Sequence, residues 1–88
     1  MGDCPLKTLR KQLGISQTDL AVLSEIPIQN VGSTETGDKK YIDSKIIRAL
    51  KEHTNVDTDQ LEKDFDKWLL DFHSHRKENV IKKLKQIM

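Results

Sequence analysis

The sequence predicts an all-α protein organised around a helix-turn-helix. Two short segments with apolar residues at helical spacing, roughly residues 17–25 and 28–34, are joined by only a few residues. Two-turn helices with so short a connection must cross steeply, which is the geometry of that motif. The 88 residues are one third charged and include only four aromatic residues. We therefore expect one domain with a core built mostly of Leu, Ile and Val.

The helix before the motif and the first motif helix are predicted from spacing and end signals. The apolar residues with the i, i+3, i+7 spacing of a first helix are Leu6, Leu9 and Leu13. A short frayed arm, residues 1–5, is expected before it, and Gly14 ends it. Ser16 is placed to cap the next helix, with Asp19 three residues later. Its buried face is expected to hold Leu20, Ala21 and Leu23.

The second motif helix and the fourth helix also have clear beginnings. Pro27 suits the first position of a helix, where its missing N–H costs nothing, and Gly37 stops the helix. A polar loop, residues 36–42, follows. Asp43 is expected to cap a fourth helix. The buried stripe of that helix is predicted to be Ile46, Ile47 and Leu50.

The fifth helix has a full entry signature and continues past the motif domain. Asp57 is the expected cap, Gln60 stands at the reciprocal position, and Val56 can pack on Leu61. We place a helix-turn-helix domain at residues 1–61 and a C-terminal helical extension at 62–88, within the same compact unit. The wide apolar stripe of the extension holds Phe65, Trp68, Leu69 and Phe72. This stripe is either a two-fold dimer or partner contact or part of the monomer's own core.

The last segment of the chain is amphipathic and basic. Residues 73–79 carry no apolar side chain, and the apolar residues after them are Val80, Ile81, Leu84 and Ile87. The segment is either a sixth helix or a continuation of the fifth. Residues 73–88 contain five bases and one acid, a charge of +4, whereas residues 25–43 contain two bases and four acids, a charge of −2. The basic block could contact DNA backbone or an acidic partner, or form a solvated face.

The motif residues resemble those of the phage repressor and Cro-type (XRE) helix-turn-helix family. The matching positions are Arg10, Ser16, Gln17, Leu20, Ala21, Ile26, Val31, Glu35 and Gly37. The resemblance covers roughly residues 6–61 and implies a five-helix, lambda-repressor-like domain that acts as a sequence-specific regulator on double-stranded DNA. It also implies a structural ion pair between Arg10 and Glu35.

The resemblance assigns roles to side chains around the second motif helix. That helix enters the major groove in the family, so its exposed residues are the expected base readers: Ile28, Gln29, Asn30, Gly32 and Ser33. The expected phosphate contacts lie at the start of the first motif helix and in the loop after the second: Ser16, Gln17, Thr36, Lys39 and Lys40.

Two departures from the family pattern support a competing function. Glu25 stands at the turn position that the family usually fills with glycine, and the second motif helix contains no Arg or Lys. An acidic motif weakens the electrostatic attraction to DNA. The alternative is a helix-turn-helix scaffold that binds a protein, as an inhibitor or adaptor of another regulator.

Several other classes of function are not indicated. The histidines, His53, His73 and His75, lack metal-ligand spacing, and no nucleophile motif or phosphate-binding glycine loop is present. We therefore expect no enzyme activity, no metal and no cofactor. No apolar run reaches membrane-spanning length, and the single Cys4 excludes an internal disulfide. A cytoplasmic location is expected.

Overall fold

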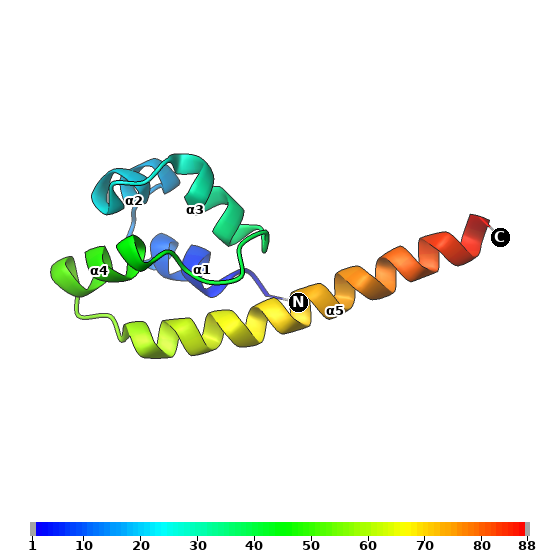
Figure 1. Ribbon diagram of the computed structural model, residues 1–88. Helices are drawn as coiled ribbons and strands as arrows, with labels where there is room; N and C mark the ends of the chain where they lie inside the picture. The colour runs from blue at the N-terminus through cyan, green and yellow to red at the C-terminus, as the bar shows by residue number, and fades with distance from the viewer. Residues whose placement is uncertain (1, 88) are drawn as a thin grey trace.

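Five α-helices make up the part of the chain that the structure, a computed structural model, describes: residues 2–87 (Figure 1). They are α1 (Pro5–Gln12), α2 (Gln17–Ser24), α3 (Ile28–Glu35), α4 (Ser44–His53) and α5 (Thr58–Ile87). Met1 and Met88, the outer ends of the two expected domain segments, lie outside the described residues. No strand occurs within residues 2–87, so the all-α prediction is confirmed.

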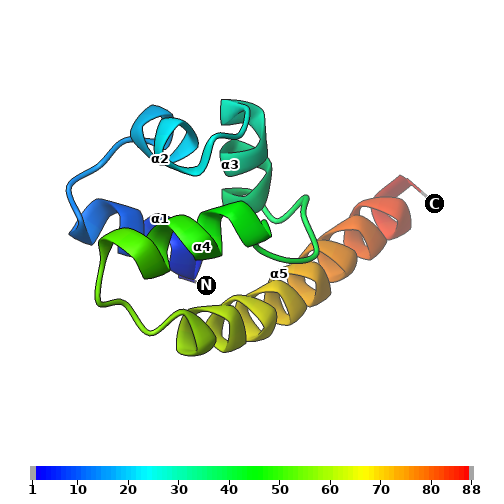
Figure 2. The same cartoon turned by 60° about the vertical axis from the view of Figure 1, so that its left-hand side comes forward.

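The helices form three tiers. The motif helices α2 and α3 lie on one side of α1 and α4, and the first half of α5 lies on the other side (Figures 1 and 2). The contacts follow this order, because α2 packs on α3 and α4, whereas α5 packs on α1 and α4. The motif is therefore supported from below by two helices that themselves rest on α5.

The core is aliphatic apart from one aromatic ring. Its fully buried side chains include Leu6, Leu20, Val31, Ile46, Leu50 and Phe65. Cys4 belongs to this core with 1% exposure, so the expected frayed arm is wrong at this residue. Its thiol lies 3.8 Å from the Thr34 carbonyl oxygen, and burial raises the pKa of that thiol. The segment before α1 is thus held against the motif.

Leu23, which was expected to be buried, and Leu13, which was expected to belong to the first helix, both lie at the surface. Leu13 and Leu23 are each 39% exposed. α1 ends at Gln12, and Leu13 is its C-cap residue. In α2 the side chains that face inward are Leu20, Ala21 and Ser24, so Leu23 lies beyond the edge of the buried face. A helix of two turns offers too few positions for apolar spacing to settle which face is inside.

The caps of α4 and α5 are made by the predicted aspartates. The Asp43 carboxylate accepts from the Lys45 N–H at 2.8 Å, and the Asp57 carboxylate accepts from the Gln60 N–H at 3.1 Å. The reciprocal bond expected from the Gln60 side chain is absent, because its Nε2 donates to Asp64 at 2.9 Å. Asp64 lies one turn further along α5 and competes successfully for the same amide.

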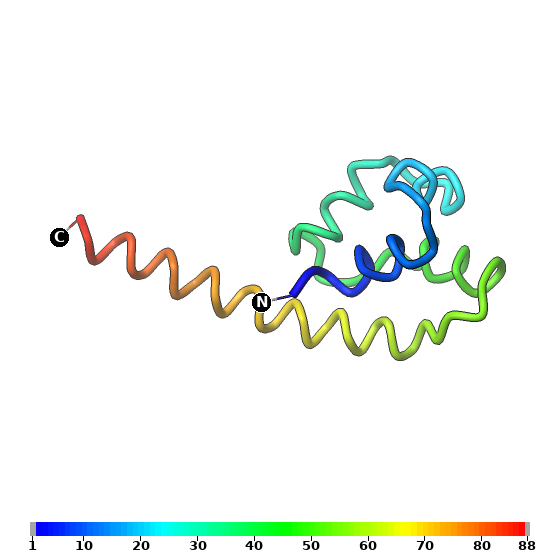
Figure 3. The backbone as a smooth tube through the Cα atoms, turned by 180° about the vertical axis from the view of Figure 1, so that it is seen from behind, coloured from blue at the N-terminus to red at the C-terminus, as the bar shows by residue number. Residues whose placement is uncertain are grey.

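α5 is one unbroken helix of 30 residues. It runs without a break through the expected boundary between residues 61 and 62, and the segment after residue 73 continues it rather than forming a sixth helix. Every residue from His73 to Ile87 is exposed, and this second half projects away from the body of the protein (Figure 3). Among residues 2–87, no helix combines the length and the apolarity needed to cross a bilayer.

Phe65 is the fully buried aromatic side chain through which α5 packs into the core. We expect Phe65→Ala to lower the free energy of unfolding by about 3–5 kcal/mol, because it removes a fully buried ring and leaves a cavity. The matched control is Val22→Ala on α2, where the side chain is 73% exposed and the change should stay within about 0.5 kcal/mol. Urea unfolding followed by circular dichroism measures both. A loss below about 1 kcal/mol for Phe65→Ala is incompatible with this packing.

Candidate nucleic-acid interface

The start of α2 is fixed by a reciprocal cap. The Ser16 hydroxyl accepts from the Asp19 N–H at 3.0 Å, and the Asp19 carboxylate accepts from the Ser16 N–H at 2.9 Å. These hydrogen bonds, the one from the Ser16 backbone first, lower the pKa of Asp19. The capped end leaves the first N–H groups of α2 pointing outward, in the arrangement that favours an anion.

The turn between α2 and α3 is made by a residue in a left-handed conformation. Glu25 has φ 57° and ψ 45°, and it is the only non-glycine residue with positive φ in the described chain. Its N–H donates to the Val22 carbonyl oxygen at 3.2 Å, and the next N–H, of Ile26, donates to Ala21 at 3.1 Å. These bonds close the helix and hold the unusual conformation, which costs a non-glycine residue about 1–2 kcal/mol. The turn between α2 and α3 therefore keeps its left-handed conformation, although Glu25 stands where the family usually has glycine.

A buried ion pair joins α1 to the end of α3. Arg10 donates through Nε to Glu35 Oε2 at 2.8 Å and through Nη2 to Glu35 Oε1 at 3.0 Å. Its third bond goes from Nη1 to the Ile15 carbonyl oxygen at 2.9 Å. The Glu35 side chain is only 2% exposed, and its hydrogen bond raises the pKa of Arg10. Such a two-bond contact fixes both distance and orientation between the two helices.

Gln17 belongs to the same buried group. Its Nε2 donates to Glu35 Oε1 at 3.1 Å, so the side chain is half buried at the start of α2. The side chain expected to meet a phosphate therefore also ties α2 to the ion pair. One amide hydrogen and the backbone N–H of the helix start remain for an outside partner.

The outer face of α3 carries the expected base readers. Ile28 is 41% exposed and Gln29 is exposed, at the first turn of the helix. Asn30, Gly32 and Ser33 are half buried. A Cβ added at Gly32 would meet no atom within 4 Å, so the protein's own packing does not require a glycine there. α3 thus presents an uncharged face, and Gly32 leaves a position without a side chain within it.

The loop between α3 and α4 is held by α5. Gly37 has φ +84°, and a Cβ on it would come within 2.7 Å of the Phe72 ring. His73 Nε2 lies 3.2 Å from the Gly37 carbonyl oxygen, and Arg76 Nη1 lies 3.8 Å from Asp38 Oδ1. Sequence reasoning identified Gly37 as a helix stop but missed this contact, which joins residues about 36 positions apart.

The same loop displays the expected phosphate contacts. Lys39 and Lys40 are both exposed. The Thr36 hydroxyl is within hydrogen-bond distance of the Ser33 carbonyl oxygen at 3.3 Å and of Asp38 Oδ2 at 3.2 Å. The two lysines therefore follow directly after the exposed face of α3, on a loop whose first residues are fixed.

The four aromatic and apolar residues expected as a dimer or partner contact lie largely against the monomer. Phe65 is 1% exposed, and Trp68 and Leu69 pack partly buried against the core. The Trp68 indole N–H donates to the Gly2 carbonyl oxygen at 3.1 Å, and the indole stacks on Phe72 with ring centroids 5.1 Å apart. Of the two readings left open by the sequence, the packing favours completion of the monomer's own core.

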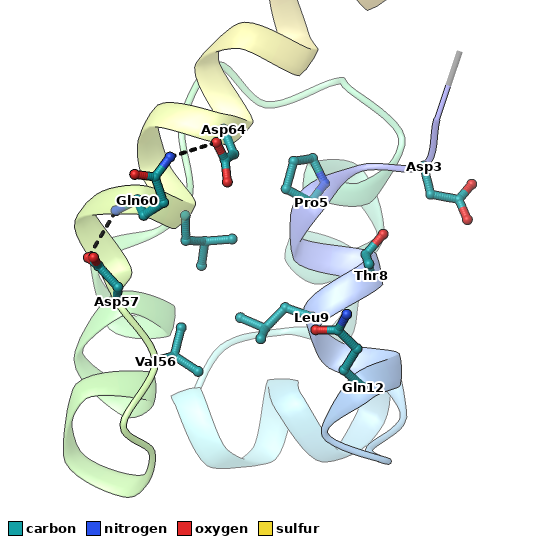
Figure 4. A pocket seen from close by; sticks show the side chains of 10 residues that line it. Asp3, Pro5, Thr8, Leu9, Gln12, Val56, Asp57, Gln60 and Asp64 are labelled. Atoms are coloured by element: carbon teal, nitrogen blue, oxygen red, sulfur yellow. Dashed lines mark hydrogen bonds between the residues drawn. The ribbon is translucent and has the colours of Figure 1, made fainter.

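An open cleft of about 460 Å³ lies between α1 and the start of α5 (Figure 4). Its only charged lining residues are acids: Asp3 near the N-terminus, Asp57 just before α5 and Asp64 on α5. This charge repels phosphate, so the cleft is not part of the nucleic-acid interface. Within residues 2–87, no three His, Cys, Asp or Glu side chains are gathered closely enough to hold a metal ion.

Comparison with known proteins gives one result. The family model described as Helix-turn-helix matches residues 6–61, which is more than half of the chain and includes α1 to α4 and the first turn of α5. No match was found among curated proteins or among solved structures.

The buried ion pair leads to a stability prediction. Arg10→Met should lower the free energy of unfolding by about 3–5 kcal/mol, because Glu35 then keeps a buried charge without a cation. The double variant Arg10→Met/Glu35→Gln removes both charges and should lose less than the single variant. Urea unfolding of the three proteins checks this. A single-variant loss of about 1 kcal/mol or less is the behaviour of a surface pair and contradicts the prediction.

Proposed function

Because the chain belongs to the XRE-type helix-turn-helix family, whose members are DNA-binding transcription regulators, we propose that it recognises a specific operator in double-stranded DNA as phage repressors and Cro proteins do. Members of this family are generally not enzymes. The protein would act in the cytoplasm by occupying the operator, without chemical change to the DNA.

The exposed face of α3 is the main support for this proposal. A helix in the major groove reads bases with the residues at its N-terminal end. Gln29 can make two hydrogen bonds to adenine, and Ile28 can rest on a thymine methyl group. Asn30, Gly32 and Ser33 follow on the same helix and complete the proposed base-reading set. Arg10 and Glu35 hold α3 at a fixed angle, so the base-reading face is already oriented in the protein without DNA.

The proposed phosphate contacts flank the base-reading face. Ser16 and Gln17 stand at the N-terminal end of α2, where helix N–H groups attract an anion. Thr36, Lys39 and Lys40 lie on the loop that follows α3. Because α3 itself has no Arg or Lys, electrostatic attraction supplies a smaller share of the affinity than in a basic reader. We therefore expect a shallow dependence of affinity on salt.

The first test separates base reading from phosphate contact. An operator is first obtained by selecting the protein against a random pool of duplex DNA. Gln29→Ala should then cost about 1–3 kcal/mol on this operator and relax one position of it, as measured by fluorescence anisotropy. Lys39→Ala should weaken all sequences alike and reduce the salt slope by about 1. Lys39 is chosen over Lys40, because Lys40 also lines a hollow against α5.

Two results oppose the proposal. Equal loss on operator and random duplex for Gln29→Ala contradicts its role as a base reader. Failure to enrich any sequence, with binding only at low salt, contradicts operator recognition itself. In that case the helix-turn-helix scaffold that binds a protein becomes the better explanation, and α3 is the surface to test against protein partners.

Gly32 offers a second test, in which stability and binding change in opposite directions. Gly32→Ala should raise the free energy of unfolding by up to about 1 kcal/mol, because alanine favours the helix and nothing lies near the added Cβ. The same methyl group would stand where DNA approaches α3, so affinity for the operator should fall. Val22→Ala, at an exposed side chain of α2 outside the proposed contacts to bases and phosphates, is the control for general disturbance. Unchanged operator affinity in a more stable Gly32→Ala variant argues against close approach at this position.

A further inference from the structure

The projecting half of α5, residues 73–87, is basic, and most of its charge is not used within the protein. It contains five bases and one acid, a charge of +4, and every residue in it is exposed. Among the described residues, Arg76 is the only one of these bases that lies near a carboxylate, that of Asp38. The four lysines of this half therefore present their charge to the surroundings. An exposed surface of this kind attracts a polyanion such as nucleic acid.

The half of α5 that packs on the body carries the opposite charge. Residues 58–72 contain five acids and two bases, a charge of −3. The tier formed by α1 and α4 separates this acidic half from α2 and α3, whereas the projecting half extends beyond that tier (Figures 1 and 2). A duplex bound at α3 would therefore be separated from the acids by the body of the protein and would be accessible to the bases.

The side of α5 that faces the body continues into the projecting half as a row of polar residues. The Phe72 ring lies against Gly37 in the loop after α3. Steps of four, three and four residues from Phe72 lead to Arg76, Asn79 and Lys83, so these side chains lie on the same side of the helix. Arg76 Nη1 lies 3.8 Å from a carboxylate oxygen of the loop, which shows that this side faces the loop. We call Arg76, Asn79 and Lys83 the polar stripe.

The polar stripe has the composition of a surface that contacts phosphates. Arginine, lysine and asparagine side chains are among the donors that bind phosphate oxygens in protein–DNA complexes. Glu78 is the one acid of the projecting half. It lies two residues from Arg76 and therefore points to another side of the helix. The stripe thus combines two positive charges and an amide without a carboxylate among them.

We propose that the polar stripe binds the phosphate backbone of the duplex beside the site that α3 reads. This rests on the proposed function, because α3 sets the position of the duplex. The stripe continues the row of proposed phosphate contacts that begins with Lys39 and Lys40 in the loop. Residues 73–87 span about 22 Å at a rise of 1.5 Å each, which equals the axial length of about six base pairs. The protein would therefore cover DNA beyond the bases that it reads.

The polar stripe would supply electrostatic attraction that the motif lacks, because α3 has no Arg or Lys. Each phosphate that a protein neutralises adds about 0.9 to the slope of log affinity against log salt concentration. Arg76 and Lys83 would therefore add about 2 to the shallow slope expected from the motif. Contacts to phosphates carry no sequence information, so the stripe would strengthen binding to any duplex.

The first experiment compares two double variants with the native chain. Arg76→Gln/Lys83→Gln removes two charges from the stripe. The matched control Lys77→Gln/Lys85→Gln removes two charges from other sides of the same half, one and two residues away. Affinity for the selected operator and for a random duplex is measured by fluorescence anisotropy over a range of salt. All four positions are exposed, so circular dichroism should show an intact fold for both variants.

Only the stripe variant should lose phosphate contacts. Its salt slope should fall by about 2, and its affinity for both duplexes should fall by about tenfold. The slope of the control should change by less than about 0.5. Lys83 lies seven residues beyond Arg76 and pairs with no carboxylate of the described chain. Lys83→Gln alone should therefore lower the slope by about 1 without disturbing the loop.

The second experiment shortens the DNA beside the operator. One duplex extends about six base pairs beyond the operator at both ends, and the other stops at its ends. The native chain and the control should bind the short duplex about tenfold more weakly, because the stripe then has no backbone to contact. The stripe variant should bind both duplexes equally well. Equal affinity of the native chain for both duplexes overturns the proposed contact.

The outcomes separate this contact from operator recognition. An enriched operator with a lower slope for the stripe variant alone supports both. An enriched operator with equal slopes for the two double variants overturns the stripe and leaves operator recognition standing. Without an enriched operator, a slope on random duplex that depends on the stripe supports the backbone contact and contradicts operator recognition. Binding to neither duplex overturns both, and an acidic protein is then the partner to test for residues 73–87.

Discussion

The buried contact between Arg10 and Glu35 is the interaction on which the arrangement of the motif depends. α2 and α3 are only two turns each, so their own packing area is small and does not fix their angle by itself. The carboxylate of Glu35 accepts from Arg10 on α1 and from Gln17 on α2, so it joins three helices at one point. An arrangement that separates the two side chains leaves a buried charge without its partner, which is destabilising. This contact therefore favours one position of α3 relative to α1 and α2. The exposed residues of α3 take their position from this contact, because they belong to the same short helix.

Local signals were sufficient to predict most of the fold. The cap at Ser16, the stop at Gly37 and the caps at Asp43 and Asp57 all depend on residues a few positions apart, and each is found where the sequence indicates. The errors have a common cause. Leu13 and Leu23 lie at the edges of two-turn helices, where burial is decided by which neighbours arrive rather than by spacing. The Gln60 side chain bonds Asp64 instead of the backbone N–H of Asp57, and sequence alone does not rank these two partners.

The sequence predicted which residues of the proposed interface lie at the surface, but not the contacts that hold their loop. Resemblance to a family places Gln29 and the loop lysines at the surface, and they are exposed. The contact of Phe72 and His73 with Gly37 joins the loop to α5 across more than thirty residues, and no local pattern announces it. The sequence explained Gly37 as a helix stop. It did not indicate that a side chain at this position would also collide with the Phe72 ring. A residue with one adequate local reason can still be constrained by a distant neighbour.

The position of His73 connects the two halves of the molecule. Its ring Nε2 lies 3.2 Å from the carbonyl oxygen of Gly37, in the loop after α3, and the same residue begins the half of α5 that projects from the body. Arg76, one turn further along the helix, lies near Asp38 of the loop. These contacts hold the start of the loop that bears Lys39 and Lys40. Because fixing a loop before binding lowers the entropy lost on binding, this part of α5 would favour the proposed phosphate contacts.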